Sequence, residues 1–226
     1  VLDFFFALNT ERNTTTAQQL PIASDAHFSL QGLLNSVRQR LDRLNEFAPK
    51  SEIDTDAKSF AEEALEPAWN NATAELGDSA MAEGRDLSQK LPQEQRCLSP
   101  SDFGFHNALR DLNGGLCFLD FEYAGWDDPA KMVCDFFLHP GVPVPQSFFA
   151  HFYSKVTAFF SADSDLSQRI RLTYPLHRIK WCCIVLNEFL KLESERREFA
   201  GAGTDHEQVK ATQLAKAKYT LARSAP

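Results

Sequence analysis

A stretch of turn and strand pattern in the middle of the chain interrupts a sequence whose apolar residues otherwise recur at helical spacing. At its centre, Asn113-Gly114-Gly115 separates two short apolar segments, which is a strong signal for a β-hairpin. We therefore expect Ala108–Arg110 and Leu116–Phe121 to pair as antiparallel strands. The predicted fold class is mainly α with a small β-hairpin.

Helices are predicted on both sides of this hairpin. Apolar residues at helical spacing, with Ser29 as the N-cap, predict a helix from Leu30 to about Phe47. The same spacing predicts further helices at Val1–Asn9, Thr55–Met81 with a kink or break at Pro67, Ala130–Leu138, Pro145–Phe160, Leu166–Tyr174, Leu176–Leu192 and Asp205–Ala222. The charged run Lys191–Glu198 is interpreted as a solvated helix end.

The composition excludes several classes of protein. With 226 residues, 43% of them hydrophobic and 24% charged, the chain can bury a substantial core and does not resemble a disordered protein. A net charge of −8 without a Lys/Arg cluster argues against nucleic-acid binding, although it would tolerate a cationic small substrate. The apolar runs are too short to span a bilayer and no targeting signal is visible, so we expect no membrane partner.

The five cysteines are Cys97, Cys117, Cys134, Cys182 and Cys183. Their number is odd and none forms a C-x-x-C pair, so we expect reduced, buried thiols in a cytoplasmic protein. The chain opens as VLDFFFALN, without Met and already inside an apolar helix. We therefore expect it to be a fragment of a longer protein.

Polar side chains gather at the ends of the two predicted hairpin strands. Asp102 and Asn107 precede the first strand, and Asp120 and Glu122 follow the core of the second. Antiparallel pairing would bring the segment near Asn107 close to Asp120. Carboxylate and amide oxygens suit Mg²⁺, and Asp102 would then be left to accept a proton from an attacking hydroxyl.

A base Asp, an Asn five residues later and an Asp after the next strand are the parts of a kinase catalytic loop. SPSDFGFHNAL followed by FLDFEYAGWDDPAKMVCDF resembles the aminoglycoside phosphotransferase and choline kinase group, the small-molecule relatives of protein kinases. The motif covers about residues 97–136. The resemblance implies one helical C-terminal lobe of a kinase-like fold over residues 1–226, with the N-terminal nucleotide-binding lobe absent from this chain.

The resemblance also implies roles for individual residues. Asp102 matches the catalytic base, Asn107 and Asp120 match the magnesium ligands, and Asp135 matches an aspartate with a structural role. The implied activity is an ATP- and Mg²⁺-dependent transfer of phosphate to a hydroxyl of a small molecule, such as an aminoglycoside, a sugar, choline or an amino alcohol. A lobe without its partner lobe is expected to be nearly inactive, because phosphoryl transfer depends on positioning and electrostatics.

The sequence departs from the family pattern in two ways. Pro100 stands where the H-x-D motif has a histidine, and the chain contains neither a Gly-rich loop nor a lysine in a V-A-I-K-like strand. A non-catalytic, pseudokinase-like binding module is therefore the alternative. A metal-dependent hydrolase that uses Asp102, His106, Asp120 and Glu122 ranks last, because paired-histidine spacing is missing.

The remaining polar residues near the motif are given structural roles. His106 is interpreted as a hydrogen-bonding residue of the loop, and His139, beside Pro140, as a turn residue. Asp127 and Asp128 are interpreted first as N-caps of the helix that starts near Pro129 and second as cleft residues. Trp126 is expected in the core.

Overall fold

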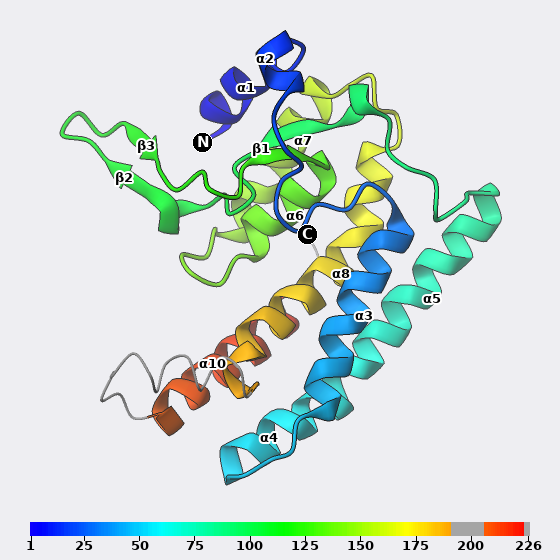
Figure 1. The fold of residues 1–226 in the computed structure, drawn as a ribbon, viewed down its shortest axis with the longest axis vertical. Coiled ribbons are helices and arrows are strands. Elements are labelled where there is room, and N and C mark those ends of the chain that lie inside the picture. The colour runs from blue at the N-terminus through cyan, green and yellow to red at the C-terminus, as the bar shows by residue number, and fades with distance from the viewer. Residues whose placement is uncertain (191–205, 224–226) are drawn as a thin grey trace. The chain divides into compact units, whose positions relative to one another are not determined.

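The structure, a computed structural model, describes residues 1–190 and 206–223 (Figure 1). This part of the chain is mainly helical with small antiparallel sheets, which confirms the predicted fold class. It forms two compact units, the first built from residues 1–32 and 86–173 and the second from residues 33–85 and 174–223. The predicted run Lys191–Glu198 and Asp205 lie entirely outside the described residues. No helix within them is both long and apolar enough to cross a membrane.

The first unit contains all the strands found in the described residues. Its elements are α1 (Leu2–Thr10), α2 (Thr15–Gln18), β1 (Cys97–Ser99), β2 (Ala108–Arg110), β3 (Leu116–Phe118), β4 (Gly125–Asp127), α6 (Pro129–Leu138), α7 (Phe149–Phe159), the first half of α8 (Leu166–Val185) and the 3-10 turns Gln93–Gln95, Phe105–Asn107 and Gln146–Phe148. The second unit is helical. Its elements are most of α3 (Leu30–Glu46), α4 (Glu52–Phe60), the π-turn Ala61–Leu65, α5 (Glu66–Glu83), the second half of α8, the 3-10 turn Leu186–Phe189 and α10 (His206–Ala222).

The predicted hairpin is present, with a shorter second strand. β2 and β3 pair antiparallel with Leu109 opposite Cys117, and Gly114 adopts a positive φ of 85° in the turn between them. β3 ends at Phe118, not at Phe121, because Asp120 adopts a left-handed φ of 61° that leaves the extended conformation. Asp and Asn tolerate this conformation better than other residues with a side chain.

A second two-stranded sheet, between β1 and β4, was not predicted. The strands run antiparallel with Leu98 opposite Trp126. Gly125 in β4 lies so close to the backbone of residues 21–23 that an added Cβ would come within 2.2 Å of the Pro21 carbonyl oxygen. The sequence interpretation missed this sheet because its strands are three residues long and distant in the chain. Trp126 is buried, as predicted.

The predicted helix at Thr55–Met81 begins earlier and contains an irregular turn. Ser51 caps α4 by accepting a hydrogen bond from the Asp54 N–H, so the helix starts at Glu52. The π-turn Ala61–Leu65 separates α4 from α5, whose first turn contains Pro67. Because proline cannot donate a backbone hydrogen bond, the preceding turn widens at the position where the sequence predicts a kink or break.

The prediction of two separate helices around Pro175 is wrong. α8 runs without interruption from Leu166 to Val185 with Pro175 inside it, and a 3-10 turn then continues to Phe189. Proline removes one backbone hydrogen bond from a helix. Tyr174 and Leu176, on either side of it, are almost completely buried, and that burial offsets the loss.

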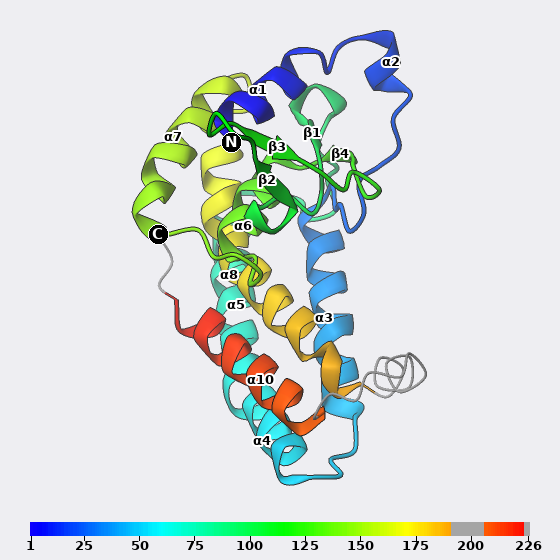
Figure 2. The same cartoon turned by 90° about the vertical axis from the view of Figure 1, so that its left-hand side faces the viewer.

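Each unit has its own core. Phenylalanine rings dominate the core of the first unit, where Phe136 of α6 stacks on Phe152 of α7 with ring centroids 4.8 Å apart. In the second unit α10 packs against α4 (Figure 2). Lys210 Nζ lies 2.8 Å from Asp54 Oδ1. All five cysteines are free thiols, and four of them are buried as predicted. Cys117 is the exception, because it lies on the exposed hairpin.

Candidate functional site

The loop that carries the predicted base begins at the end of β1 with a tight turn. Ser101 adopts a left-handed φ of 67°, and its N–H donates to Ser99 Oγ at 3.0 Å while its hydroxyl donates to the Ser24 carbonyl at 2.8 Å. The Asp102 N–H donates to the Pro100 carbonyl at 2.9 Å. Pro100 is buried, so the turn is fixed on both sides of the strained residue.

Aromatic packing holds the next part of the loop against the core of the first unit. The Phe103 ring is buried and lies 5.0 Å from the Phe118 ring and 5.3 Å from the Phe136 ring, measured between centroids. Phe105 contacts Phe136 as well, at 5.8 Å. These contacts anchor the residues on either side of Gly104, so the side chains of Asp102 and Asn107 have a fixed support.

Asp102 and Asn107 are in direct contact. The Asn107 amide nitrogen lies 3.1 Å from Asp102 Oδ2 and 3.1 Å from the Asp102 carbonyl oxygen, so its two N–H groups are directed at Asp102. The amide oxygen of Asn107 consequently faces away from this contact. The arrangement leaves an oxygen of the type that hard cations bind.

The third predicted residue, Asp120, follows β3 directly beyond the hairpin ladder. The Leu119 N–H donates to the Asn107 carbonyl at 2.9 Å, which continues the pairing of the two strands and brings Asp120 to the Asn107 end of the hairpin. Its side chain is exposed, and its charge acts on His106. Glu122 is exposed too and hydrogen-bonds Tyr123, raising the pKa of that phenol.

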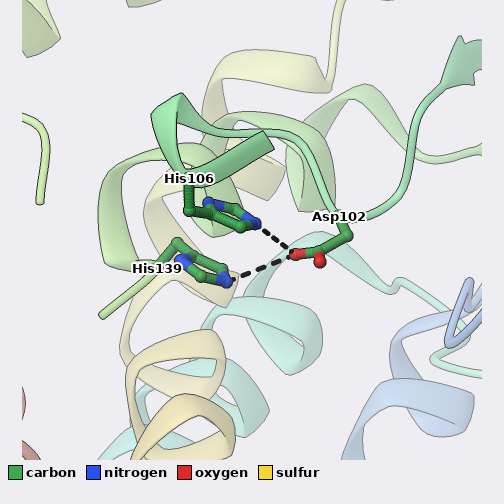
Figure 3. Close-up of side chains that lie close together, drawn as sticks. All are labelled: Asp102, His106 and His139. Carbon is green, nitrogen blue, oxygen red and sulfur yellow. Dashed lines mark hydrogen bonds and ion pairs between the residues drawn. The ribbon is translucent and has the colours of Figure 1, made fainter. Parts of the chain in front are cut away.

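Two histidines hold the other oxygen of the Asp102 carboxylate (Figure 3). His106 Nε2 lies 3.0 Å and His139 Nε2 lies 3.2 Å from Asp102 Oδ1. The two imidazole rings stack, with centroids 3.7 Å apart and planes 2° from parallel. The hydrogen-bonding role predicted for His106 agrees with this geometry, whereas His139, interpreted as a turn residue, takes part in the site.

These contacts shift the pKa values of the loop. The hydrogen bond from His139, together with the charges of both imidazoles, lowers the pKa of Asp102 to about 2. Burial and the neighbouring His139 lower the pKa of His106, and they outweigh the opposite effect of Asp102. Asp102 is therefore ionised throughout the physiological range.

Asp102, His106 and His139 carry ligand-type atoms that lie within 4.8 Å of one another, as in many metal sites. Their orientation argues against one shared ion. An imidazole binds a metal in its own ring plane at about 2.0–2.1 Å, and two parallel, stacked rings have no such point in common. In addition, His139 Nδ1 accepts the Gly141 N–H at 3.0 Å, so the ring proton lies on Nε2. A metal bound at Nε2 would require that proton on Nδ1 instead.

Buried ion pairs stabilise β4 and α6, the elements next to the site. Lys131 of α6 lies between Asp127 and Asp135, with Nζ–O distances of 2.9 Å and 3.2 Å. Burial opposes the charge of Lys131, but the two carboxylates outweigh it and raise its pKa. Asp127 is thus an ion-pair partner in β4, and the prediction of two N-caps is correct for Asp128 alone.

Asp128 belongs to a second buried ion pair. Its side chain accepts the Ala130 N–H at the start of α6, and Arg169 Nε lies 2.9 Å from Asp128 Oδ2. The same guanidinium contacts Asp163 at 2.5 Å. These pairs connect the first turn of α6 to α8 within the first unit and fix the helix that directly precedes His139.

Comparisons of the chain with protein-family models, with curated proteins and with solved structures found no match.

Proposed function

We propose that this chain is the C-terminal lobe of a kinase-like small-molecule phosphotransferase, which uses ATP and Mg²⁺ to phosphorylate a hydroxyl group. Asp102 acts as the base, and Asn107 and Asp120 are the magnesium ligands. The contact between Asp102 and Asn107 is the observation that carries the proposal. It brings the two residues of the D-x4-N pattern together through a side-chain hydrogen bond.

The residues present fit Mg²⁺ chemically. The Asn107 amide points its nitrogen at Asp102, which leaves its oxygen for a cation, and Asp120 adds a carboxylate at the same end of the hairpin. Magnesium prefers a small number of protein oxygens and completes its shell with water and phosphate. When bound, the ion would neutralise negative charge on the phosphates of ATP.

The Asp102 carboxylate suits a role that depends on orientation. Its Oδ1 accepts from two imidazoles, while Oδ2 accepts one N–H from Asn107 and keeps a lone pair for a substrate hydroxyl. A pKa of about 2 makes Asp102 a weak base. Phosphoryl transfer tolerates this, because catalysis depends on aligning the hydroxyl and the proton can leave late.

The proposal includes a small hydroxyl-bearing acceptor and a cytoplasmic location. Free thiols support the location, since structural disulfides are typical of oxidising compartments. The net charge of −8 is compatible with an amine-bearing acceptor such as an aminoglycoside or an amino alcohol.

A non-catalytic binding module is the second candidate. The three N–H groups directed at the Asp102 carboxylate and its low pKa favour it, because a carboxylate so well satisfied could hold a ligand without taking its proton. Such a module would bind ATP with Mg²⁺ and show no turnover.

The test is a phosphotransfer assay with the full-length protein. ATP consumption with Mg²⁺ is measured against aminoglycosides, sugars, choline and amino alcohols. The substitution Asp102→Ala should reduce transfer by at least about a hundredfold with an unchanged circular dichroism spectrum. Asp78→Ala, on the exposed face of α5, is the matched control. Unchanged transfer in Asp102→Ala would remove Asp102 from the role, and ATP binding without turnover in the wild type would favour the binding module.

A further inference from the structure

The sequence indicates only a turn role for His139, yet its ring contacts the proposed base. His139 is the residue after the last turn of α6, far along the chain from the loop that carries Asp102. Its Nε2 lies 3.2 Å from Asp102 Oδ1 (Figure 3). The hydrogen bond it supplies is also the largest influence on the pKa of that carboxyl.

The protonation state of the His139 ring is set by its own backbone surroundings. The Gly141 N–H donates to His139 Nδ1 at 3.0 Å, so Nδ1 is an acceptor and the proton of the neutral ring lies on Nε2. The ring in its neutral form is therefore a donor toward Asp102. A donor of this kind holds a carboxylate in one orientation, which is the role of the group that orients a catalytic base.

The support under His139 is more rigid than the support under His106. All ten residues of α6 are buried, and Lys131 ties the helix to Asp127 and Asp135. His106, in contrast, belongs to the same loop as Asp102, and the two imidazoles are themselves buried to a similar degree. Of the two imidazole contacts, the one from His139 therefore links the Asp102 carboxylate to the core of the first unit.

We propose that His139 is a positioning residue that orients the Asp102 carboxylate from the end of α6, so that Oδ2 remains available to the acceptor hydroxyl. This inference rests on the proposed phosphotransferase function. His139 would act through Asp102 and would touch neither ATP nor the acceptor. Pro100 stands where the H-x-D pattern has its histidine, and the imidazoles that contact Asp102 come instead from His106 in the loop and from His139 after α6.

Two substitutions separate the hydrogen bond from the ring stack. His139→Phe keeps an aromatic ring against His106 and removes the donor, whereas His139→Gln loses the ring and places an amide nitrogen near the position of Nε2. His151→Phe, on the exposed surface of α7, is the matched control. All variants are made in the full-length protein and compared by kcat, KM and thermal unfolding.

The expected result is a kcat lowered about tenfold to a hundredfold in His139→Phe, with KM for ATP and for the acceptor within about twofold of the wild type. His139→Gln should recover most of that loss. Equal kcat values in His139→Phe and the control would overturn the inference while leaving the phosphotransferase intact. A loss that His139→Gln does not recover, and that follows thermal stability, would reduce His139 to a packing role.

A second measurement does not depend on turnover. Long-range ¹H–¹⁵N spectra of the imidazole rings should show the His139 proton on Nε2 in the wild type and a displaced Nε2–H signal in Asp102→Asn. A proton on Nδ1, or no response to the substitution at Asp102, contradicts the positioning geometry. Absence of transfer to every acceptor in the wild type would count against the proposed function, and these spectra would still decide whether His139 holds Asp102.

Discussion

Asn9 of α1 is completely buried and pairs with the backbone of Leu98 in β1 as a neighbouring strand would. Its Nδ2 donates to the Leu98 carbonyl at 2.9 Å, and its Oδ1 accepts the Leu98 N–H at 2.8 Å. The strand that leads into the Asp102 loop is therefore held on this edge by a side chain. A buried amide that satisfies two backbone groups is costly to remove, because both groups would be left without partners.

The substitution Asn9→Leu is expected to lower the free energy of unfolding by about 1–3 kcal/mol. Leucine is close in size, so the loss comes from the unpaired N–H and C=O of Leu98. Urea titration of the folded protein measures the change. Asn13→Leu is the control, since Asn13 is exposed. A change of less than about 0.5 kcal/mol in Asn9→Leu would show that water or a rearranged strand satisfies Leu98.

Lys131 is expected to be the most sensitive charged residue of the first unit. Lys131→Met leaves Asp127 and Asp135 buried without their cation, which typically costs about 3–5 kcal/mol. The comparison variant is Lys155→Met on the exposed face of α7, for which about 0.5 kcal/mol or less is expected. Equal stability of the two variants would mean that the carboxylates are protonated in the folded protein.

The ion pair between Arg38 and Glu66 in the second unit predicts a dependence of stability on pH. Hydrogen bonds from Arg38 and Asn45 lower the pKa of Glu66 below its ordinary value of about 4.3. A lowered native pKa means that the unfolded chain binds the proton first as the pH falls. The stabilisation is therefore complete above about pH 4.3 and is lost as the pH falls through the native pKa.

Glu66→Gln should flatten this part of the acid limb. At pH 7 the variant should be less stable by about 0.5–1 kcal/mol, and the difference should shrink as the pH is lowered from 5 to 3. Unfolding free energies from urea titrations across this range give the measurement. Glu63→Gln, which changes an exposed carboxylate of the adjoining π-turn, should run parallel to the wild type. A constant difference between Glu66→Gln and the wild type would contradict the lowered pKa.

The proposed magnesium ligands predict a changed metal requirement. Asn107→Ala and Asp120→Asn should each raise the Mg²⁺ concentration needed for half-maximal transfer at least about tenfold, because each removes or weakens one of the proposed oxygen ligands. Chelation with EDTA should abolish transfer in the wild type. The control is Glu122→Gln, an exposed neighbour that is given no ligand role. Identical Mg²⁺ titrations in all three variants would exclude Asn107 and Asp120 as ligands.

Local patterns were sufficient for most of the helices and for the hairpin. The Ser29 cap, confirmed by its bond to the Gly32 N–H, and the apolar spacing of Leu33, Val37, Leu41 and Leu44 predicted α3 within one residue at its end. The turn at Gly114 likewise fixed the pairing of β2 with β3. These features depend on residues that are near one another in the chain, so periodicity and turn chemistry can detect them.

The features that the sequence did not predict all depend on packing between distant segments. The β1–β4 sheet pairs strands that are only three residues long, and α8 passes through Pro175 because the residues on both sides of it are buried. Lys131 could not be distinguished from a surface lysine until β4 and α6 enclosed it. No local signal reports burial of this kind, since burial is a property of what the rest of the chain supplies.

The candidate site, like the fold, was predictable from the sequence only in part. The sequence by itself determined which chemical groups the loop offers, because Asp102 and Asn107 lie on one short turn and Asp120 follows the second hairpin strand. Only the tertiary structure decided how the carboxylate is held. The His139 ring reaches Asp102 because aromatic contacts fix the loop on α6, and a hydrogen bond forms only when packing brings its donor to about 3 Å from the acceptor.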